Sequence, residues 1–414
     1  MRILIVTQYF WPENFKINDL VDELVKRNHQ ITVLTGKPNY PDGEIFSEFK
    51  KNPSFFNQFN GSNVIRVPLL KRGRGGSLRL IMNYFSFFIS ATLVGGWKLK
   101  GRQFDIIFVF QPSPITVGLP AIFFKKLKKI PVVFWVLDLW PESLETVSLD
   151  KSNFVMKLAG MLVSFIYKRC DLILGVSKPF CDGISDYCKD HNKIKYFPSW
   201  SENVFSNLTT SRVTEIEQYK DTFKILFAGN IGDMQDFPSI LKTAEILKGK
   251  KAKVKFFIVG DGRSLEWLKS EIVSLKLQEY IYLLGRHPLE LMPSFYASAD
   301  ALLLTLKLHP VLSMWIPGKA QSYMSAGKPI LTMLSGEGSR IVEEANCGYI
   351  ASSGDYKKLA QNILIMSELC EEKLDKLGNQ AVIYVKQEFD RNKLITKLEN
   401  WFTGLYESLK ERKL

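Results

Sequence analysis

The chain contains few of the residues that build disulfide frameworks or metal sites. Its five cysteines are odd in number and form no Cys-x-x-Cys pair, and its four histidines are scattered. We therefore expect no disulfides, a reducing cytoplasm as the setting, and no metal held by a histidine and cysteine cluster. A signal peptide is not expected either, because the first residues form a short apolar run without a small-residue cleavage site.

Acidic residues are nearly missing from one long stretch of the chain. Between Phe49 and Leu137 there is a single acid, Asp105, against fourteen lysines and arginines, and the whole chain has a formal net charge of +13. This asymmetry indicates an anionic partner. The aromatic residues of the stretch lie inside apolar runs and do not alternate with the charges, which argues against nucleic acid and favours an anionic membrane surface.

Alternating strand and helix patterns predict an α/β protein. With 414 residues, 46% of them apolar, the chain can form two domains of about 200 residues, each with its own core. The alternation predicts doubly wound parallel sheets. The expected strands are Arg2–Thr7, Gln30–Thr35, Asp105–Phe110, Val132–Val136, Leu172–Val176, Lys224–Ala228, Val254–Val259, Tyr280–Leu284, Ala301–Leu306 and Ile330–Leu334.

The domain boundary is expected at a polar break, Pro198–Asp221, after which the strand and helix pattern restarts. We expect a first domain over residues 1–200 and a second over residues 222–390. Arg391–Leu409 has helical spacing, and residues 391–414 are expected to return to the first domain. Ligands bind outside the carboxyl ends of the strands in such sheets, so a cleft between the two domains is expected to hold the ligand.

One segment, Leu78–Trp97, has about the length of a membrane span and is flanked by basic residues. Three interpretations are open: a structural helix that belongs partly to the core, an interfacial helix that dips into lipid, and a true span. The span is the least favoured, because it would place the two halves of the first sheet on opposite sides of a membrane. A second basic-flanked apolar helix, Met156–Lys168, is expected to lie in the core.

Motifs in both halves resemble one enzyme family. The second half contains, in order, FAGNIGDMQDF, FFIVGDG, LLGRHP, YASADALLLTL and PGKAQSYMSAGKPILTMLSGEGSRIVEEANCGYI, and the first contains QYFWPEN, NHQITVLTGKPNYP and VVFWVLDLWPES. Over nearly the whole chain these motifs resemble the retaining family 4 glycosyltransferases, in particular the branch that adds N-acetylated 6-deoxyamino sugars such as N-acetyl-L-fucosamine. The resemblance implies an α/β GT-B fold: two Rossmann-like domains with a cleft between them, the first binding the acceptor and the second the nucleotide sugar.

Candidate donor-binding residues lie in the second half. Lys319 precedes an expected helix, Ala320–Ser325, and a lysine beside exposed backbone N–H groups suits a diphosphate. The loop that contains Glu337, Gly338 and Ser339 precedes a second expected helix, Ile341–Ala345, and suits a phosphate or sugar. In the family, the lysine contacts the donor phosphates.

Further donor residues follow from the resemblance, with departures from the family pattern. Asn230 and Gly232 lie in the first turn of the second domain, and Arg286 lies where relatives hold the base. Asn230 stands where relatives commonly have arginine, and Gln235 where they have lysine, so phosphate neutralisation is expected to depend more on Lys319 and backbone amides. Ser322 replaces a glutamate that grips the ribose, and its single hydroxyl cannot bind two hydroxyls in the same way.

The first half supplies the candidate catalytic and acceptor residues. Leu137 occupies a position where many family members have histidine, which leaves Asp138 and Glu142 as the candidate catalytic groups. In the front-face mechanism proposed for the family, the leaving phosphate takes the acceptor proton, so the enzyme mainly positions reactants and stabilises charge. Two roles fit Asp138 equally well: orienting an acceptor hydroxyl, and capping the N-terminus of a helix.

Trp11 and Glu13 follow the first strand and are expected to contact the acceptor sugar, although Trp11 suits a core position equally well. No Asp-x-Asp motif lies in a suitable loop, which predicts a metal-independent transferase without a cofactor.

The sequence thus predicts a hexosyltransferase that moves an N-acetylated 6-deoxyamino sugar from a UDP-sugar to a polyprenyl-diphosphate-linked sugar in O-antigen or capsule assembly. We expect it in the cytoplasm, peripheral on the inner face of a bacterial membrane. Two alternatives remain: a GT-B-fold sugar-nucleotide epimerase and an inactive scaffold subunit. Leu137 argues against the epimerase, because that class needs acid–base groups.

Overall fold

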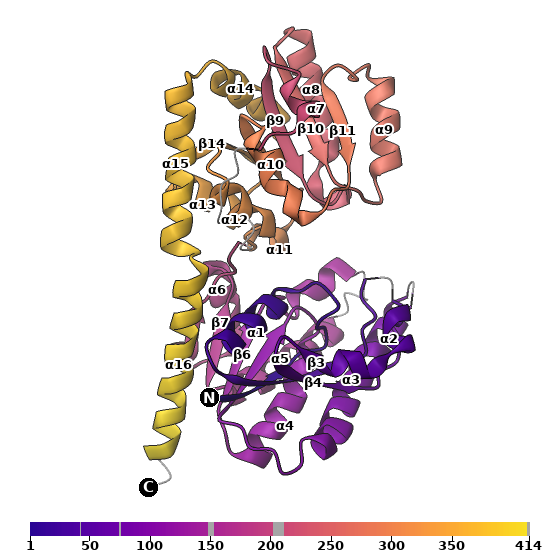
Figure 1. The fold of residues 1–414 in the computed structure, drawn as a ribbon, viewed down its shortest axis with the longest axis vertical. Helices are drawn as coiled ribbons and strands as arrows, with labels where there is room; N and C mark the ends of the chain where they lie inside the picture. Colours follow the sequence, from indigo (N-terminus) through magenta and orange to yellow (C-terminus); the bar gives the residue numbers. More distant parts are fainter. Residues whose placement is uncertain (42, 74–75, 148–152, 202–210, 412–414) are drawn as a thin grey trace. The chain divides into compact units, whose positions relative to one another are not determined.

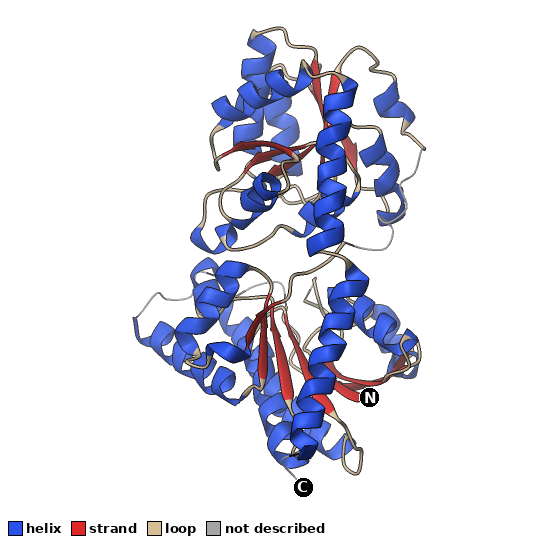
Figure 2. Ribbon diagram, turned by 90° about the vertical axis from the view of Figure 1, so that its left-hand side faces the viewer, coloured by secondary structure: helices blue, strands red, loops and turns tan. Residues whose placement is uncertain are grey.

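The computed structural model describes residues 1–41, 43–73, 76–147, 153–201 and 211–411. These residues form two compact units (Figure 1): unit 1 comprises Met1–Phe197 with Asn392–Leu414, and unit 2 comprises Pro198–Arg391. The polar break expected at Pro198–Asp221 begins at this boundary, and its residues 202–210 lie outside the described part of the chain. In each unit a β-sheet lies among helices (Figure 2).

The sheet of unit 1 has the strand order β3-β4-β2-β1-β5-β6-β7-β8. Neighbouring strands are parallel, except that β3 is antiparallel to β4. β5 and β6 are buried at every position, which explains why they consist of continuous apolar runs. The strands are β1 (Arg2–Val6), β2 (Gln30–Gly36), β3 (Gln58–Phe59), β4 (Ser62–Val67), β5 (Ile106–Gln111), β6 (Val132–Val136), β7 (Leu172–Gly175) and β8 (Ile194–Tyr196).

Helices cover both faces of this sheet. Neighbouring residues of a strand point to opposite faces. Phe134 of β6 packs on Tyr167 of α5, whereas Trp135 packs on Phe108, which in turn contacts Phe402 of α16. α5 and α16 therefore lie on opposite faces. The helices of unit 1 are α1 (Lys16–Lys26), α2 (Ser47–Lys51), α3 (Ser77–Lys98), α4 (Gly118–Lys128), α5 (Asn153–Arg169), α6 (Lys178–Tyr187) and α16 (Arg391–Glu411).

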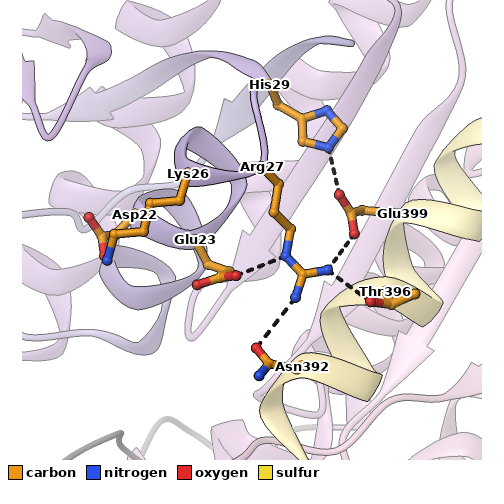
Figure 3. A network of polar contacts seen from close by, with 8 residues as sticks. All are labelled: Asp22, Glu23, Lys26, Arg27, His29, Asn392, Thr396 and Glu399. Carbon is orange, nitrogen blue, oxygen red and sulfur yellow. Dashed lines mark hydrogen bonds and ion pairs between the residues drawn. The ribbon is translucent and has the colours of Figure 1, made fainter.

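The C-terminal helix α16 is tied to α1 by a polar network (Figure 3). The guanidinium of Arg27, which directly follows α1, donates to Glu399 at 2.7 Å and to Thr396 at 2.8 Å. Glu399 also contacts Nε2 of His29 at 2.7 Å, and Glu23 binds Arg27 at 2.8 Å. These contacts join the end of the chain to residues that follow its first strand.

Unit 2 contains a fully parallel sheet with the order β11-β10-β9-β12-β13-β14. Apolar clusters lie on its two faces, one including α8 and α14, the other including α12 and α15. The strands are β9 (Phe223–Ala228), β10 (Val254–Val259), β11 (Ile281–Gly285), β12 (Ala301–Thr305), β13 (Ile330–Met333) and β14 (Gly348–Ala351). The helices are α7 (Thr214–Glu217), α8 (Phe237–Gly249), α9 (Leu265–Ser274), α10 (Met292–Ala297), α11 (Pro310–Ser313), α12 (Gly318–Ser325), α13 (Glu337–Glu344), α14 (Tyr356–Ser367) and α15 (Glu371–Glu388).

The apolar segment Leu78–Trp97, for which three interpretations were open, lies in α3. This helix packs on the sheet of unit 1 by one face only. Asn83, Phe87 and Ala91 are fully buried, and the Asn83 amide oxygen accepts from Nε2 of Gln8 at 2.6 Å. The opposite face is an exposed apolar stripe of Leu78, Met82, Phe85, Ile89, Leu93 and Trp97. In the described part of the chain, α3 is the one helix long and apolar enough to cross a membrane, and 22% of that window is buried.

The expectation that Met156–Lys168 lies in the core is correct for one face alone. In α5, Val163, Ile166 and Tyr167 are fully buried. Its other face exposes Phe154, Leu158, Met161 and Phe165. The sequence pattern missed this because both faces of the helix are apolar, so composition does not show which one packs.

Candidate functional site

Glycines let the loops at the carboxyl ends of β9 and β10 press against each other. A Cβ atom added at Gly260 would lie 1.9 Å from the carbonyl oxygen of Gly229, and one at Gly262 would lie 2.2 Å from that of Ile231. The N–H of Ile231 donates to the carbonyl of Asp261 at 2.8 Å. This contact fixes the turn that holds Asn230, which is exposed.

Gly232 belongs to the same turn and lies beneath its surface. It is buried, and a Cβ atom added there would lie 2.6 Å from Nδ2 of Asn230. Asn230 is thus a surface residue of the turn, whereas Gly232 shapes the backbone beneath it. The turn therefore presents the side-chain amide of Asn230 at its surface.

Lys319, at the start of α12, reaches this turn. Its Nζ donates to Oε1 of Gln235 at 2.7 Å and lies 3.7 Å from the centroid of the Phe227 ring. Burial lowers the pKa of Lys319 to about 7. No ion pair with a carboxylate forms at Lys319 within the described residues, so its charge is available to an anion.

The start of α13 packs directly on the start of α12. A Cβ atom added at Gly338 would lie 2.9 Å from Cδ of Pro317, and one at Gly336 would lie 2.0 Å from the carbonyl oxygen of Ser313. The first turns of both helices therefore lie beside each other. The first N–H groups of a helix have no carbonyl one full turn earlier, and they favour an anion. In this structure the N–H groups of Ala320 and Ser339 donate to the carbonyls of Pro317 and Gly336 at 2.8 and 3.1 Å.

α13 begins at Glu337, four residues before the helix expected at Ile341–Ala345. The predicted loop residues thus form the first helical turn. Glu337 is buried and accepts from Nε and Nη2 of Arg340 at 2.7 and 2.8 Å, so its carboxylate binds the protein rather than a ligand. Ser339 donates its hydroxyl to the carbonyl of Gly336 at 2.8 Å.

Ser322 and Arg286 are two further predicted donor residues. Ser322 is buried, and its hydroxyl donates to the carbonyl of Lys319 at 2.9 Å, so in this conformation it stabilises α12. Arg286 is exposed after β11, the edge strand, two positions from β9 in the sheet. Beside it, His287 packs on Phe295, with ring centroids 4.6 Å apart.

Sequence reasoning missed Tyr323, which positions the donor cluster, that is, Lys319, Gln235 and the first turns of α12 and α13. The hydroxyl of Tyr323 accepts from the N–H of Ala228 at 2.6 Å and donates to the carbonyl of Ala228 at 3.1 Å. This buried tyrosine joins α12 to the end of β9 and so holds Lys319 next to Gln235. Only its place four residues after Lys319 on a helix could have suggested the role.

In unit 1, Asp138 follows β6 and is held by neighbouring side chains. One carboxylate oxygen accepts from the hydroxyl of Ser143, and the other accepts from Nε1 of Trp140 at 3.0 Å. Burial raises the pKa of Asp138, although these hydrogen bonds oppose the shift. Glu142 accepts from the hydroxyl of Tyr187 at 3.2 Å, which links the loop to α6.

Glu13 is buried and binds the backbone of its own unit. One oxygen accepts from the N–H groups of Asn39 and Tyr40, both at 2.8 Å, and the other accepts from the N–H of Phe10 at 3.1 Å. Burial raises its pKa to about 7, against the opposing effect of these bonds. The Glu13 carboxylate therefore positions the backbone of its own unit, and its contact with an acceptor stays a prediction.

Trp11 belongs to an aromatic cluster. Its ring centroid lies 4.9 Å from that of Phe56, 5.4 Å from that of Phe59 and 5.8 Å from that of the exposed Phe55. Its backbone N–H donates to Oδ1 of Asn18 at 3.0 Å. The core interpretation of Trp11 fits these contacts, and its half-buried ring leaves an edge for a ligand.

Within the described ranges, no three side chains among His, Cys, Asp and Glu are grouped so that they could hold a metal ion.

Comparison with known proteins gives matches over both units. A Glycosyltransferase Family 4 model matches residues 17–199, and a Glycosyl transferases group 1 model matches residues 212–382. The colanic acid biosynthesis glycosyl transferase WcaI of Escherichia coli (strain K12) is 22% identical over 277 residues. That match spans 63% of this chain and 66%, just under two thirds, of the relative.

Solved glycosyltransferase structures have the same fold. HepE of Anabaena, in complex with UDP and glucose, gives a TM-score of 0.67 at 14% identity, covering 97% of this chain and 99% of that one. A glycosyltransferase from Rickettsia africae gives 0.70 at 13% identity, covering 98% of each. The chain therefore belongs to the family 4 glycosyltransferases and has the GT-B fold of two Rossmann-like domains.

Proposed function

We propose that this glycosyltransferase moves an N-acetylated 6-deoxyamino sugar from a UDP-sugar to a polyprenyl-diphosphate-linked sugar, with retention of the anomeric configuration. It acts in the assembly of O-antigen, capsule or a related polysaccharide, at the inner face of a bacterial cytoplasmic membrane. The observation that carries the proposal is Lys319, a cation without a carboxylate partner beside two helix starts.

The donor part of the proposal rests on unit 2. A diphosphate is the ligand that best suits a lysine ammonium group and the open N–H groups of α12 and α13. HepE, a structural neighbour, was solved with UDP, which supports a uridine nucleotide. Asn230 can add a neutral hydrogen bond where relatives carry a charge.

The transfer itself needs charge stabilisation more than acid–base groups. As the bond between the anomeric carbon and the phosphate oxygen breaks, negative charge grows on the diphosphate, and Lys319 with the helix N–H groups stabilises it. The acceptor hydroxyl forms the new bond, and its proton goes to the leaving phosphate. Asp138, held by Trp140 and Ser143, orients that hydroxyl. The proposal includes no metal and no cofactor.

The lipid acceptor is supported by the surface of unit 1. The exposed apolar stripes of α3 and α5 lie on helices that end in basic residues, Lys98 in α3 and Lys168 and Arg169 in α5, as expected of a protein that rests on an anionic membrane. WcaI, a relative in sequence, is named for the biosynthesis of a bacterial polysaccharide, which supports the proposed pathway class.

A panel of donors and acceptors tests the proposal. UDP-, GDP- and dTDP-sugars are incubated with and without polyprenyl-diphosphate-N-acetylglucosamine, and nucleotide release is measured. We expect release from one UDP-amino sugar, dependent on the lipid. Release from GDP- or dTDP-sugars alone would contradict the uridine donor, and release that ignores the lipid would contradict the acceptor.

A further inference from the structure

A groove on unit 1 lies outside the proposed donor and acceptor residues. It has a volume of about 1020 Å³ and lies among α3, α4, α5 and the segment before β8. Its apolar floor is formed by Phe88, Leu119, Ile122, Phe123 and Phe165, and its charged rim by Lys125, Lys126, Lys129, Lys168, Arg169, Asp171, Asp190 and Lys193. Six cations thus oppose two acids.

Part of this positive charge has no partner in the protein. Nζ of Lys125 binds Asp171 at 2.6 Å, and Nζ of Lys193 donates to the carbonyls of Lys168 and Cys170. By contrast, Lys126 and the side chain of Lys168 are exposed and form no ion pair or hydrogen bond within the described residues. They extend from α4 and from α5, on two sides of the groove.

The groove lies at the opposite edge of the sheet from Asp138. Lys129 precedes β6 and Asp171 precedes β7, so the rim is at the amino ends of the strands. Asp138 follows the carboxyl end of β6. The five residues of β6 separate the two edges by about 17 Å, at roughly 3.3 Å per residue. The groove is therefore not where the acceptor diphosphate would react.

The groove is lined by both basic and aromatic side chains, which favours an anion that also has an apolar part. Phe123 and Phe165 of the floor are exposed, and Phe165 ends the apolar stripe of α5. Phe88 belongs to α3, whose own stripe runs beside it. A ligand here would place an anionic group among the lysines and a hydrocarbon part against the aromatic rings.

We propose that this groove binds the phosphate headgroup of an anionic membrane phospholipid, separate from the lipid acceptor. The inference rests on the membrane location in the proposed function and adds a defined contact to it. Lys126 and Lys168 bind the phosphate from two sides, and the stripes of α3 and α5 contact the acyl chains.

Vesicle flotation of the full-length protein tests this site. Phosphatidylcholine vesicles with and without phosphatidylglycerol are compared for wild type, the groove variant Lys126→Gln/Lys168→Gln and a control, Lys50→Gln/Lys51→Gln. The control removes the same charge from exposed lysines of α2 in the same unit. We expect the groove variant to lose about tenfold in affinity for the anionic vesicles and the control to lose much less. Because the substituted lysines all lie in unit 1, thermal unfolding of the full-length protein serves as the folding control for all three.

Three outcomes would overturn the proposal, each in a different way. Equal losses in the groove variant and the control would show diffuse attraction without a headgroup site. Wild-type binding by the groove variant would leave the groove to a soluble anion or a protein. Failure of the wild type to bind either vesicle would remove the membrane location itself, while lipid-dependent nucleotide release, measured in detergent, would still test the transferase separately.

Discussion

Lys319 is the side chain whose loss should affect donor binding most. Lys319→Ala removes the half-buried cation that binds Gln235, so UDP affinity should fall by about 1.5–3 kcal/mol, the usual range for a charged hydrogen bond. Titration calorimetry at pH 6.5 measures this. Lys307→Ala, an exposed lysine of the same unit, is the matched control and should bind UDP nearly as wild type does. Unchanged affinity in Lys319→Ala would remove it from the site.

The lowered pKa of Lys319 predicts a pH dependence. Because its pKa in the free protein is about 7, against 10.5 for an ordinary lysine, the ammonium loses its proton as pH rises above 7. Affinity for a UDP-sugar should then fall, by up to about tenfold per pH unit, and binding should take up a proton. Lys319→Arg stays charged and should lack this fall. A flat wild-type profile from pH 6 to 9 would contradict the assignment.

The same shift affects stability in the opposite direction. Since folded Lys319 holds its proton less tightly than the unfolded chain does, its contribution to the free energy of unfolding grows as pH rises from 7 towards 10.5. At neutral pH the lysine therefore contributes less to the free energy of unfolding than it does at high pH, and neutral pH is where its ammonium group can bind phosphate.

Glu13 should matter for folding rather than for direct acceptor contact. Glu13→Ala leaves three N–H groups without an acceptor, two of them in buried contacts, which should cost about 2–4 kcal/mol of unfolding free energy. Glu13→Gln keeps an oxygen for Asn39 and Tyr40 and should lose less. Thermal unfolding compares the two variants. No loss in either would mean that the loop contacts are unimportant, and an equal loss in both would mean that an amide oxygen does not replace the carboxylate.

Among the elements, α3 has two faces that should respond differently to substitution. Phe85→Ser/Ile89→Ser alters the exposed stripe, so it should leave the melting temperature nearly unchanged and weaken binding to anionic vesicles. Phe87→Ala, on the fully buried face, should instead destabilise unit 1 by about 3–5 kcal/mol. Vesicle flotation and thermal unfolding separate these effects. Unchanged flotation in the stripe variant would contradict the membrane role of α3.

The strand pattern of both sheets could be predicted from sequence because buried parallel strands are continuous apolar runs. Val132–Val136 and Val254–Val259 match β6 and β10 in full. Strands without such runs were missed, namely β3, β4, β8 and β14. The start of α13 was also misplaced, because Gly336 and Gly338 suggested a loop, whereas Gly338 is a helical residue packed on Pro317.

At the scale of the whole molecule, sequence motifs identified the family, and packing decided what each motif residue contacts. Lys319 lies where the motif indicated, beside Gln235. Ser322 and Glu337 bind neighbouring protein groups, which their motifs did not indicate. Such orientations depend on contacts between residues far apart in the chain, and the local spacing of residues does not encode them. The hydrogen bond between the hydroxyl of Tyr323 and the N–H of Ala228 is an example.

The central claim is that the enzyme joins a sugar from a UDP donor to a polyprenyl-diphosphate-linked acceptor. Mass spectrometry of the lipid, extracted after incubation with UDP-amino sugars, measures this directly. We predict that wild type adds the mass of one N-acetylated 6-deoxyamino sugar to the lipid and that Lys319→Ala adds little or none. A lipid of unchanged mass with every donor, from an enzyme that still binds UDP, would contradict the claim.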